Sequence, residues 1–141
     1  MARYVKPTLE TKFHINFAWW EKQGNKLKAL LRSQACPECL AEYEEAEPQN
    51  FDWIDPESGE IFQIDLLWNL INKHCGQDAN FIEETMPLTT AIFRAFIANN
   101  NSPLTADEIH EIVKQKSPSL ILRTVGGHKV YQGIQPVTQS A

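Results

Sequence analysis

Two helix-start signals and a glycine pair lie within residues 102–137, and they restrict the fold more than any other stretch does. Thr105-Ala-Asp-Glu108 is a capping box, in which the threonine and glutamate side chains each satisfy a backbone N–H at a helix start. Ser117-Pro118 is a second helix start, with proline at the first helical position. Gly126-Gly127 then ends this helix before a β-rich tail. The pattern predicts two short, packed helices followed by extended chain.

The second helix has an alternative. Residues 120–125 are rich in aliphatic and β-branched side chains, and two glycines followed by His128 and Lys129 also favour a tight hairpin over 120–132. The Ser-Pro start favours a helix that continues to about Val125. A helix is therefore the expectation, and the hairpin stays open.

The rest of the chain combines a strand, a hairpin and helices. Residues 12–17 alternate polar and apolar side chains, which predicts a strand with His14 on its polar face. Residues 51–64 predict a β-hairpin, because proline and glycine lie in the turn between two apolar runs. Helices are expected over about 19–34, from Pro37, from Asp65 with Gly76 as C-cap, and over 88–99.

Charge is distributed unevenly. The net charge of −5 combines +5 over residues 1–32, −12 over 33–87 and +2 over 88–141. This asymmetry is compatible with a polyanion that contacts the two ends and avoids the middle. Attraction between the acidic middle and basic ends of the same chain, or a protein partner, is slightly favoured, because dedicated nucleic-acid binders are usually more basic.

Composition predicts a folded protein in a reducing compartment. Hydrophobic residues make up 43% of the chain and charged residues 22%, which favours a packed interior. No apolar run approaches the ~20 residues that span a bilayer, and the N-terminal stretch lacks the apolar segment of a signal peptide. A cytoplasmic location is expected, where three cysteines are more often thiols or metal ligands than a disulfide framework.

The sharpest chemical motif is a pair of cysteines separated by two residues. Cys36 and Cys39 at a helix start can share one metal ion, and zinc is the usual occupant. Cys75 supplies a third thiol. The fourth ligand is expected to be His14, which lies on the polar face of its strand, with His74 as the alternative. Neighbouring side chains on a helix diverge by about 100°, so His74 and Cys75 bind one ion only if the helix end unwinds.

Two other interpretations of the cysteines remain. They can be small buried residues with no ligand, or a thioredoxin-like redox pair, although the pattern lacks the βαβ context of such a pair. Four protein ligands would make the site closed and structural. No phosphate-binding glycine loop, serine nucleophile elbow or calcium loop is present in the sequence, so an enzyme is the least favoured class.

The 102–137 stretch resembles the winged helix-turn-helix superfamily in its order of elements. That resemblance implies a recognition helix over 117–125 and a wing after it. Arg123 would contact guanine or phosphate, or the whole module would dock on protein. The candidate contacts are Lys114, Lys116, Ser119, Arg123, His128 and Lys129. Lys-Phe-His-Ile, Cys-Pro-Glu-Cys and the C-terminal segment together also resemble a family of small uncharacterised bacterial proteins, which implies no activity.

The predicted fold class is mainly α with a small β component (α+β). A zinc-stabilised N-terminal lobe (1–86) packs on a winged-helix-like lobe (87–137), with a loose tail (138–141). The predicted function is a non-enzymatic zinc-stabilised protein that contacts nucleic acid, possibly with a regulatory role. The alternative is an accessory subunit that docks on a larger protein assembly without touching nucleic acid. No membrane or small-molecule partner is expected.

Overall fold

The structure, a computed structural model, describes residues 6–137, so the predicted tail at 138–141 lies outside the described residues. Within that range it contains seven α-helices and two small antiparallel sheets, which confirms the mainly α, α+β class. The elements are β1 (Phe13–Ile15), α1 (Phe17–Glu21), α2 (Lys26–Gln34), α3 (Pro37–Glu45), β2 (Asn50–Ile54), β3 (Ile61–Asp65), α4 (Leu66–Lys73), a 3₁₀ turn η1 (Cys75–Gln77), α5 (Leu88–Ala98), α6 (Ala106–Val113), α7 (Pro118–Val125) and β4 (Ile134–Pro136).

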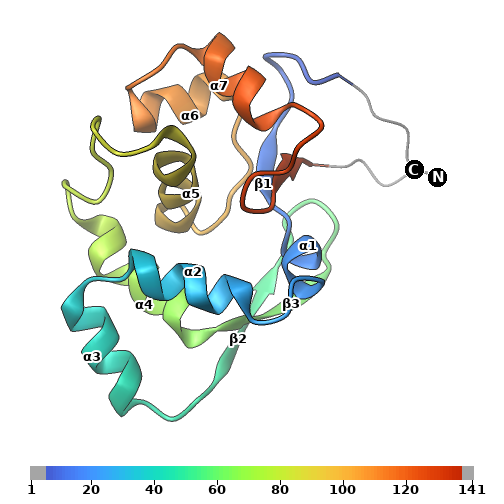
Figure 1. The fold of residues 1–141 in the computed structure, drawn as a ribbon. Helices are drawn as coiled ribbons and strands as arrows, with labels where there is room; N and C mark the ends of the chain where they lie inside the picture. Colours follow the sequence, from blue (N-terminus) through green and yellow to red (C-terminus); the bar gives the residue numbers. More distant parts are fainter. Residues whose placement is uncertain (1–5, 138–141) are drawn as a thin grey trace.

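One hydrophobic core runs through both predicted lobes. Helix α5 lies at the centre, between α4 on one side and α6 on the other (Figure 1). Its Phe96 is fully buried in the same cluster as Leu67 of α4 and Ile121 of α7. The division at residue 86 stays a prediction, but side chains on its two sides share this core.

Strand β1 joins the two ends of the described chain. It pairs antiparallel with β4, with His14 opposite Gln135. On its other edge, Phe13 exchanges backbone hydrogen bonds of 2.7 and 3.0 Å with Leu104, in the segment between α5 and α6. The strand is shorter than the predicted 12–17, because Asn16 caps helix α1 and Phe17 begins it. All three strand residues are buried.

The asparagines that follow α5 form the second connection to β1. The fully buried Asn101 side chain accepts the Ile15 N–H at 2.7 Å and donates to the Ile15 carbonyl at 2.9 Å, so its amide pairs with β1 as a neighbouring strand would. Asn100 accepts the indole N–H groups of Trp53 and Trp68, each at 3.0 Å. Asn100 and Asn101 have φ of 56° and 61°, a region that asparagine enters more readily than most residues.

The predicted β-hairpin is confirmed. β2 and β3 pair in register from Asn50 opposite Asp65 to Ile54 opposite Ile61. Its inner face carries the buried Trp53, whose ring packs edge-on against Phe17 at 5.0 Å. The Asp65 side chain accepts the Leu67 N–H at 2.9 Å, which confirms the predicted N-cap of α4.

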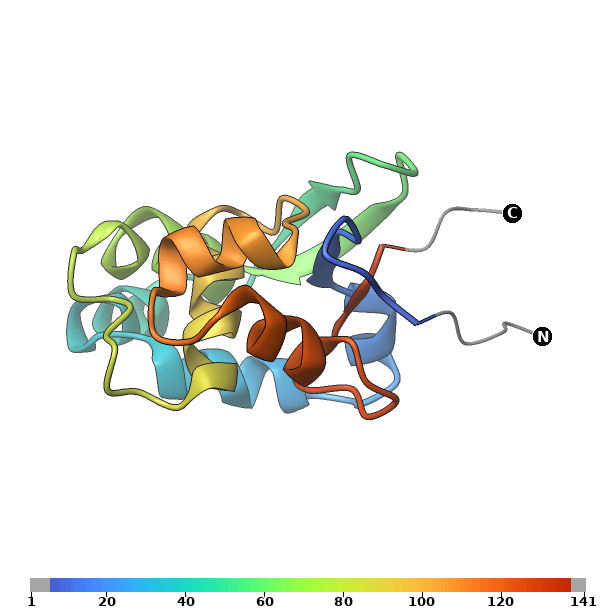
Figure 2. The same cartoon turned by 90° about the horizontal axis from the view of Figure 1, so that it is seen from above.

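The C-terminal stretch forms the predicted helix pair. Both hydrogen bonds of the Thr105–Glu108 capping box are present at the start of α6. α7 is a helix that ends at Val125, so the alternative hairpin over 120–132 is wrong. The chain then turns at Gln132 and Gly133, both with positive φ, and enters β4, whose partner is β1. Figure 2 shows α6 and α7 side by side, with the β2–β3 hairpin extending away from the helices.

Candidate metal centre

The CxxC motif forms the first half of a ligand cluster at the start of α3. Cys36 is the N-cap of this helix and has extended backbone angles, while Pro37 occupies the first helical position. The Cys36 Sγ accepts the Cys39 N–H at 3.4 Å. This local turn, which proline at the first position favours, places both sulfur atoms on the same side of the helix start.

The second half of the cluster exists because α4 unwinds at His74. The helix ends at Lys73, and His74 has φ −108° and ψ −92°, outside the helical region. Gly76 was expected to be the C-cap. It instead lies inside η1, where an added Cβ would come within 2.7 Å of the Ile71 carbonyl oxygen. The unwound end removes the helical divergence of neighbouring side chains, so that His74 and Cys75 reach the same point.

The ligand atoms of Cys36, Cys39, His74 and Cys75 all lie within 4.8 Å of one another. His74 Nδ1 is 3.4 Å from the Cys36 sulfur and 3.6 Å from the Cys39 sulfur, and the Cys39 and Cys75 sulfurs are 3.5 Å apart. Tetrahedral zinc with ordinary bond lengths needs sulfur–nitrogen separations of about 3.6 Å and sulfur–sulfur separations of about 3.8 Å. These three separations match a shared ion of this size to within a few tenths of an ångström.

Hydrogen bonds among these four side chains explain their close approach less well than a shared metal ion does. An imidazole nitrogen has one lone pair or one proton, yet two sulfur atoms approach His74 Nδ1 at nearly equal distances. Burial, together with the neighbouring Cys36 and Cys75 thiols, raises the pKa of the Cys39 thiol to about 12. A cation at the centre would stabilise the thiolate that burial disfavours, because metal binding displaces the thiol proton.

His14 is not part of this group, so the preferred fourth ligand is corrected to the alternative, His74. His14 was expected on an open, polar face, but β1 lies between β4 and the segment at Asn101 and Leu104, and the side chain is only 9% exposed. Its Nδ1 is buried without a hydrogen-bond partner. Burial lowers its pKa, which Asp55 and Glu57 partly oppose.

The Cys₃His group can hold a metal ion such as zinc. Its ligands come from two helix ends separated by more than thirty residues, so a bound ion would cross-link α3 to α4. Cys39 is the only buried residue of α3. The other contacts of α3 include the hydrogen bond that the half-buried Tyr43 donates to Asp65 and the ion pair of Glu44 with Arg32. Four protein ligands leave no position for a reacting water, which is typical of structural rather than catalytic sites.

The candidate contact residues lie together at the other end of the molecule. All six are exposed: Lys114, Lys116, Ser119, Arg123, His128 and Lys129. Ser119 and Arg123 are four residues apart on the outer side of α7, whereas Ile121 and Val125 face the core. The Lys129 ammonium lies 5.2 Å from the centre of the Tyr131 ring. This position is compatible with a contact surface, and the contacts themselves stay predictions.

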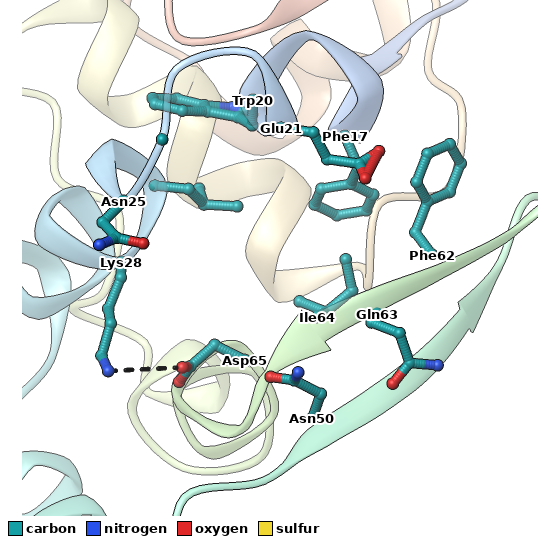
Figure 3. Close-up of a pocket in the computed structure, with 12 residues that line it drawn as sticks. Phe17, Trp20, Glu21, Asn25, Lys28, Asn50, Phe62, Gln63, Ile64 and Asp65 are labelled. Carbon is teal, nitrogen blue, oxygen red and sulfur yellow. Dashed lines mark ion pairs between the residues drawn. The ribbon is translucent and has the colours of Figure 1, made fainter.

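One cavity was not predicted. A cavity of about 270 Å³ opens between the α1–α2 segment and the hairpin (Figure 3). Its apolar wall is formed by aromatic and aliphatic side chains, and Lys28 and Asp65 form an ion pair of 3.9 Å at its edge. Glu21 lies near Phe17 and points toward Phe62. Three separate segments build the cavity, and no local motif marks it.

Comparisons with protein-family models, curated proteins and solved structures found no match to this chain. The winged-helix and bacterial-family resemblances therefore stay predictions. None of the helices between residues 6 and 137 has the length and hydropathy needed to cross a membrane.

Proposed function

We propose that this chain is a non-enzymatic, zinc-stabilised binding protein that contacts nucleic acid through a winged-helix-like surface on α7 and the loop after it. One structural zinc ion is bound by Cys36, Cys39, His74 and Cys75. The observation that carries the proposal is the convergence of these three thiols and one imidazole within 4.8 Å. A set rich in sulfur selects zinc over magnesium or calcium, which prefer oxygen ligands.

The contact surface is proposed from charge and exposure. No Asp or Glu follows Glu111 in the sequence, so α7 and the loop after it carry cations without competing carboxylates. Arg123 and Lys129 are both exposed on this surface, and Lys114 and Lys116 flank the turn before α7. Arginine and lysine contacts to phosphate supply most non-specific affinity for nucleic acid.

The test is titration of labelled duplex DNA and single-stranded RNA at several salt concentrations. Arg123→Ala combined with Lys129→Ala is expected to weaken binding about tenfold at low salt and to lower the salt slope by about 2. Lys22→Ala combined with Lys26→Ala removes the same charge from an exposed surface elsewhere and serves as the control. The nucleic-acid proposal fails if the two double variants behave alike or if no binding is detectable. Docking on a larger protein assembly would then be the better account.

A further inference from the structure

The outer face of the β2–β3 hairpin is an unpartnered apolar surface. Ile54 and Ile61 lie directly opposite each other in the register and are 59% and 58% exposed, the highest values among the large hydrophobic side chains of residues 6–137. The inner face is used by the protein itself, because Trp53 and Ile64 are buried there. A cross-strand isoleucine pair on a projecting hairpin (Figure 2) therefore remains available to a second molecule.

The charge around this pair has one sign. Five acids lie on the hairpin, and the sequence contains no Lys or Arg between Arg32 and Lys73. Asp52, Glu57 and Glu60 are exposed. Nucleic acid would be repelled here, and a second copy that met this face symmetrically would bring like charges together. The surface is complementary to a basic polypeptide that also carries an aliphatic side chain.

The cavity beside the hairpin adds a specific position for a cation. Gln63 lines this cavity and lies two residues from Ile61 on the same strand face, so the two features adjoin along β3. Figure 3 shows the Glu21 carboxylate near Phe17 and pointing toward Phe62, whose rings pack on each other at 6.0 Å. Glu21 forms no ion pair with another residue in 6–137, whereas Asp65 already pairs with Lys28. A carboxylate next to aromatic rings binds a guanidinium or ammonium group by an ion pair and a cation–π contact.

The backbone of β3 allows an extended partner to lie between these features. Among the described elements, β2 and β3 form a sheet of two strands, so no third strand pairs with the outer edge of β3. Such an edge accepts an added strand, and the alternation of its side chains then places neighbouring residues on opposite faces, one on the side of Ile54 and Ile61 and the next on the side of Phe62. One extended segment can present an aliphatic residue to the isoleucine pair and a basic residue to the cavity.

We propose that the outer face of β2–β3 and the adjoining cavity dock an extended, basic polypeptide segment. A lysine or arginine side chain is seated at Glu21 beside the half-buried Phe62, and an aliphatic side chain covers Ile54 and Ile61. This site lies on a different surface from α7, and it does not depend on the proposed nucleic-acid contact.

The experiment titrates the full, zinc-loaded chain with a labelled peptide of alternating arginine and valine at about 150 mM salt, where long-range attraction is screened. A peptide of alternating glutamate and valine is the charge control. Binding of the basic peptide alone is expected, with amide NMR shifts confined to the hairpin and the α1–α2 segment. Detectable binding of the acidic peptide, or no binding of the basic one, would overturn the proposal.

Variants locate the site. Glu21→Gln, which keeps the shape of the side chain, and Ile54→Ser with Ile61→Ser are each expected to weaken binding about tenfold. Glu42→Gln with Glu47→Gln removes two exposed charges from the α3 region and is expected to change affinity less than about twofold. An equal loss of peptide affinity in all three variants would show non-specific attraction and overturn the proposal. A dimer in sedimentation that dissociates on Ile54→Ser with Ile61→Ser would assign the face to a second copy instead.

Discussion

The cysteine cluster and the β1 connection both join distant parts of the chain, but they do so by different physical means. The cluster brings the start of α3 to the end of α4 through side chains that are largely at the surface: His74 is exposed, and Cys36 and Cys75 are half-buried. The β1 connection brings Ile15 to Asn101 through hydrogen bonds in the interior. The first would be completed by a bound ion, whereas the second is complete without one.

The difference shows which part of the fold lacks a core of its own. α3 fully buries only Cys39 and otherwise packs through the half-buried Tyr43, so coordination by a metal would add to a small packing contribution. α5, by contrast, buries six of its residues, and it positions Asn101 just beyond its end. Metal removal distinguishes the two connections, because only the cysteine cluster is expected to respond to it.

Removal of the metal is expected to have the largest effect. At free zinc 1,000-fold above its Kd, binding adds about 4 kcal/mol to the free energy of unfolding, and a chelator removes that contribution. Thermal denaturation with and without chelator measures the loss. Hydrogen exchange should show that α3 amides lose protection while α5 and α6 keep theirs. The same chelator should leave Cys36→Ser with Cys39→Ser unaffected, and a wild type that does not respond to it contradicts the account.

Asn101→Ala is expected to lower the free energy of unfolding by about 2–4 kcal/mol, because the Ile15 N–H and carbonyl both lose a buried partner. Urea denaturation measures the change, and it should be the same with and without chelator. The exposed Asn80→Ala is the matched control, with an expected change within about 0.5 kcal/mol. A loss in Asn101→Ala that depends on zinc would show that the two connections are coupled.

The third prediction, which has the smallest expected effect, concerns the buried His14. Burial lowers the pKa of His14, so below the ordinary value the unfolded chain binds a proton that the folded chain does not. Its contribution to the free energy of unfolding is therefore full above about pH 6.5 and is lost as pH falls from there toward the folded-state pKa. His14→Gln should flatten this slope relative to wild type.

The pH series needs one safeguard, since zinc binding also weakens when its ligands are protonated. Metal content is measured at each pH, and only points with full occupancy are compared. If the free energy of unfolding changed with pH by the same amount in wild type and His14→Gln, His14 would take up its proton equally in the folded and unfolded chain. That result would contradict the effect expected from its burial.

Local patterns predicted most of the elements and half of the candidate site, although the helix expected over about 19–34 is two helices, α1 and α2, separated at Gly24 with φ of 71°. The Thr105–Glu108 capping box, the Ser117-Pro118 start and the hairpin turn each depend on residues close in sequence, and each formed as expected. The CxxC spacing is equally local, which is why Cys36 and Cys39 were identified as a pair. Such features need no knowledge of the tertiary fold.

The remaining parts depended on distant packing. His14 was misplaced because alternation within 12–17 does not reveal that β1 is covered on both sides by β4 and the Asn101 segment. The unwinding at His74 follows partly from the close approach of Gly76 to Ile71, which only the folded helix shows. The hydrogen bonds of Asn101 with Ile15 join residues 86 positions apart in the sequence, so no local pattern shows them.

The central claim is that one zinc ion joins α3 to α4 through three sulfur atoms and one imidazole nitrogen. X-ray absorption at the zinc edge, with elemental analysis of protein purified without chelator, tests it most directly. The account predicts about one zinc per chain, with three sulfurs at about 2.3 Å and one nitrogen at about 2.0–2.1 Å. The nitrogen should disappear in His74→Ala and persist in His14→Ala. Less than about half an equivalent of zinc, or a nitrogen that is lost only in His14→Ala, would contradict it.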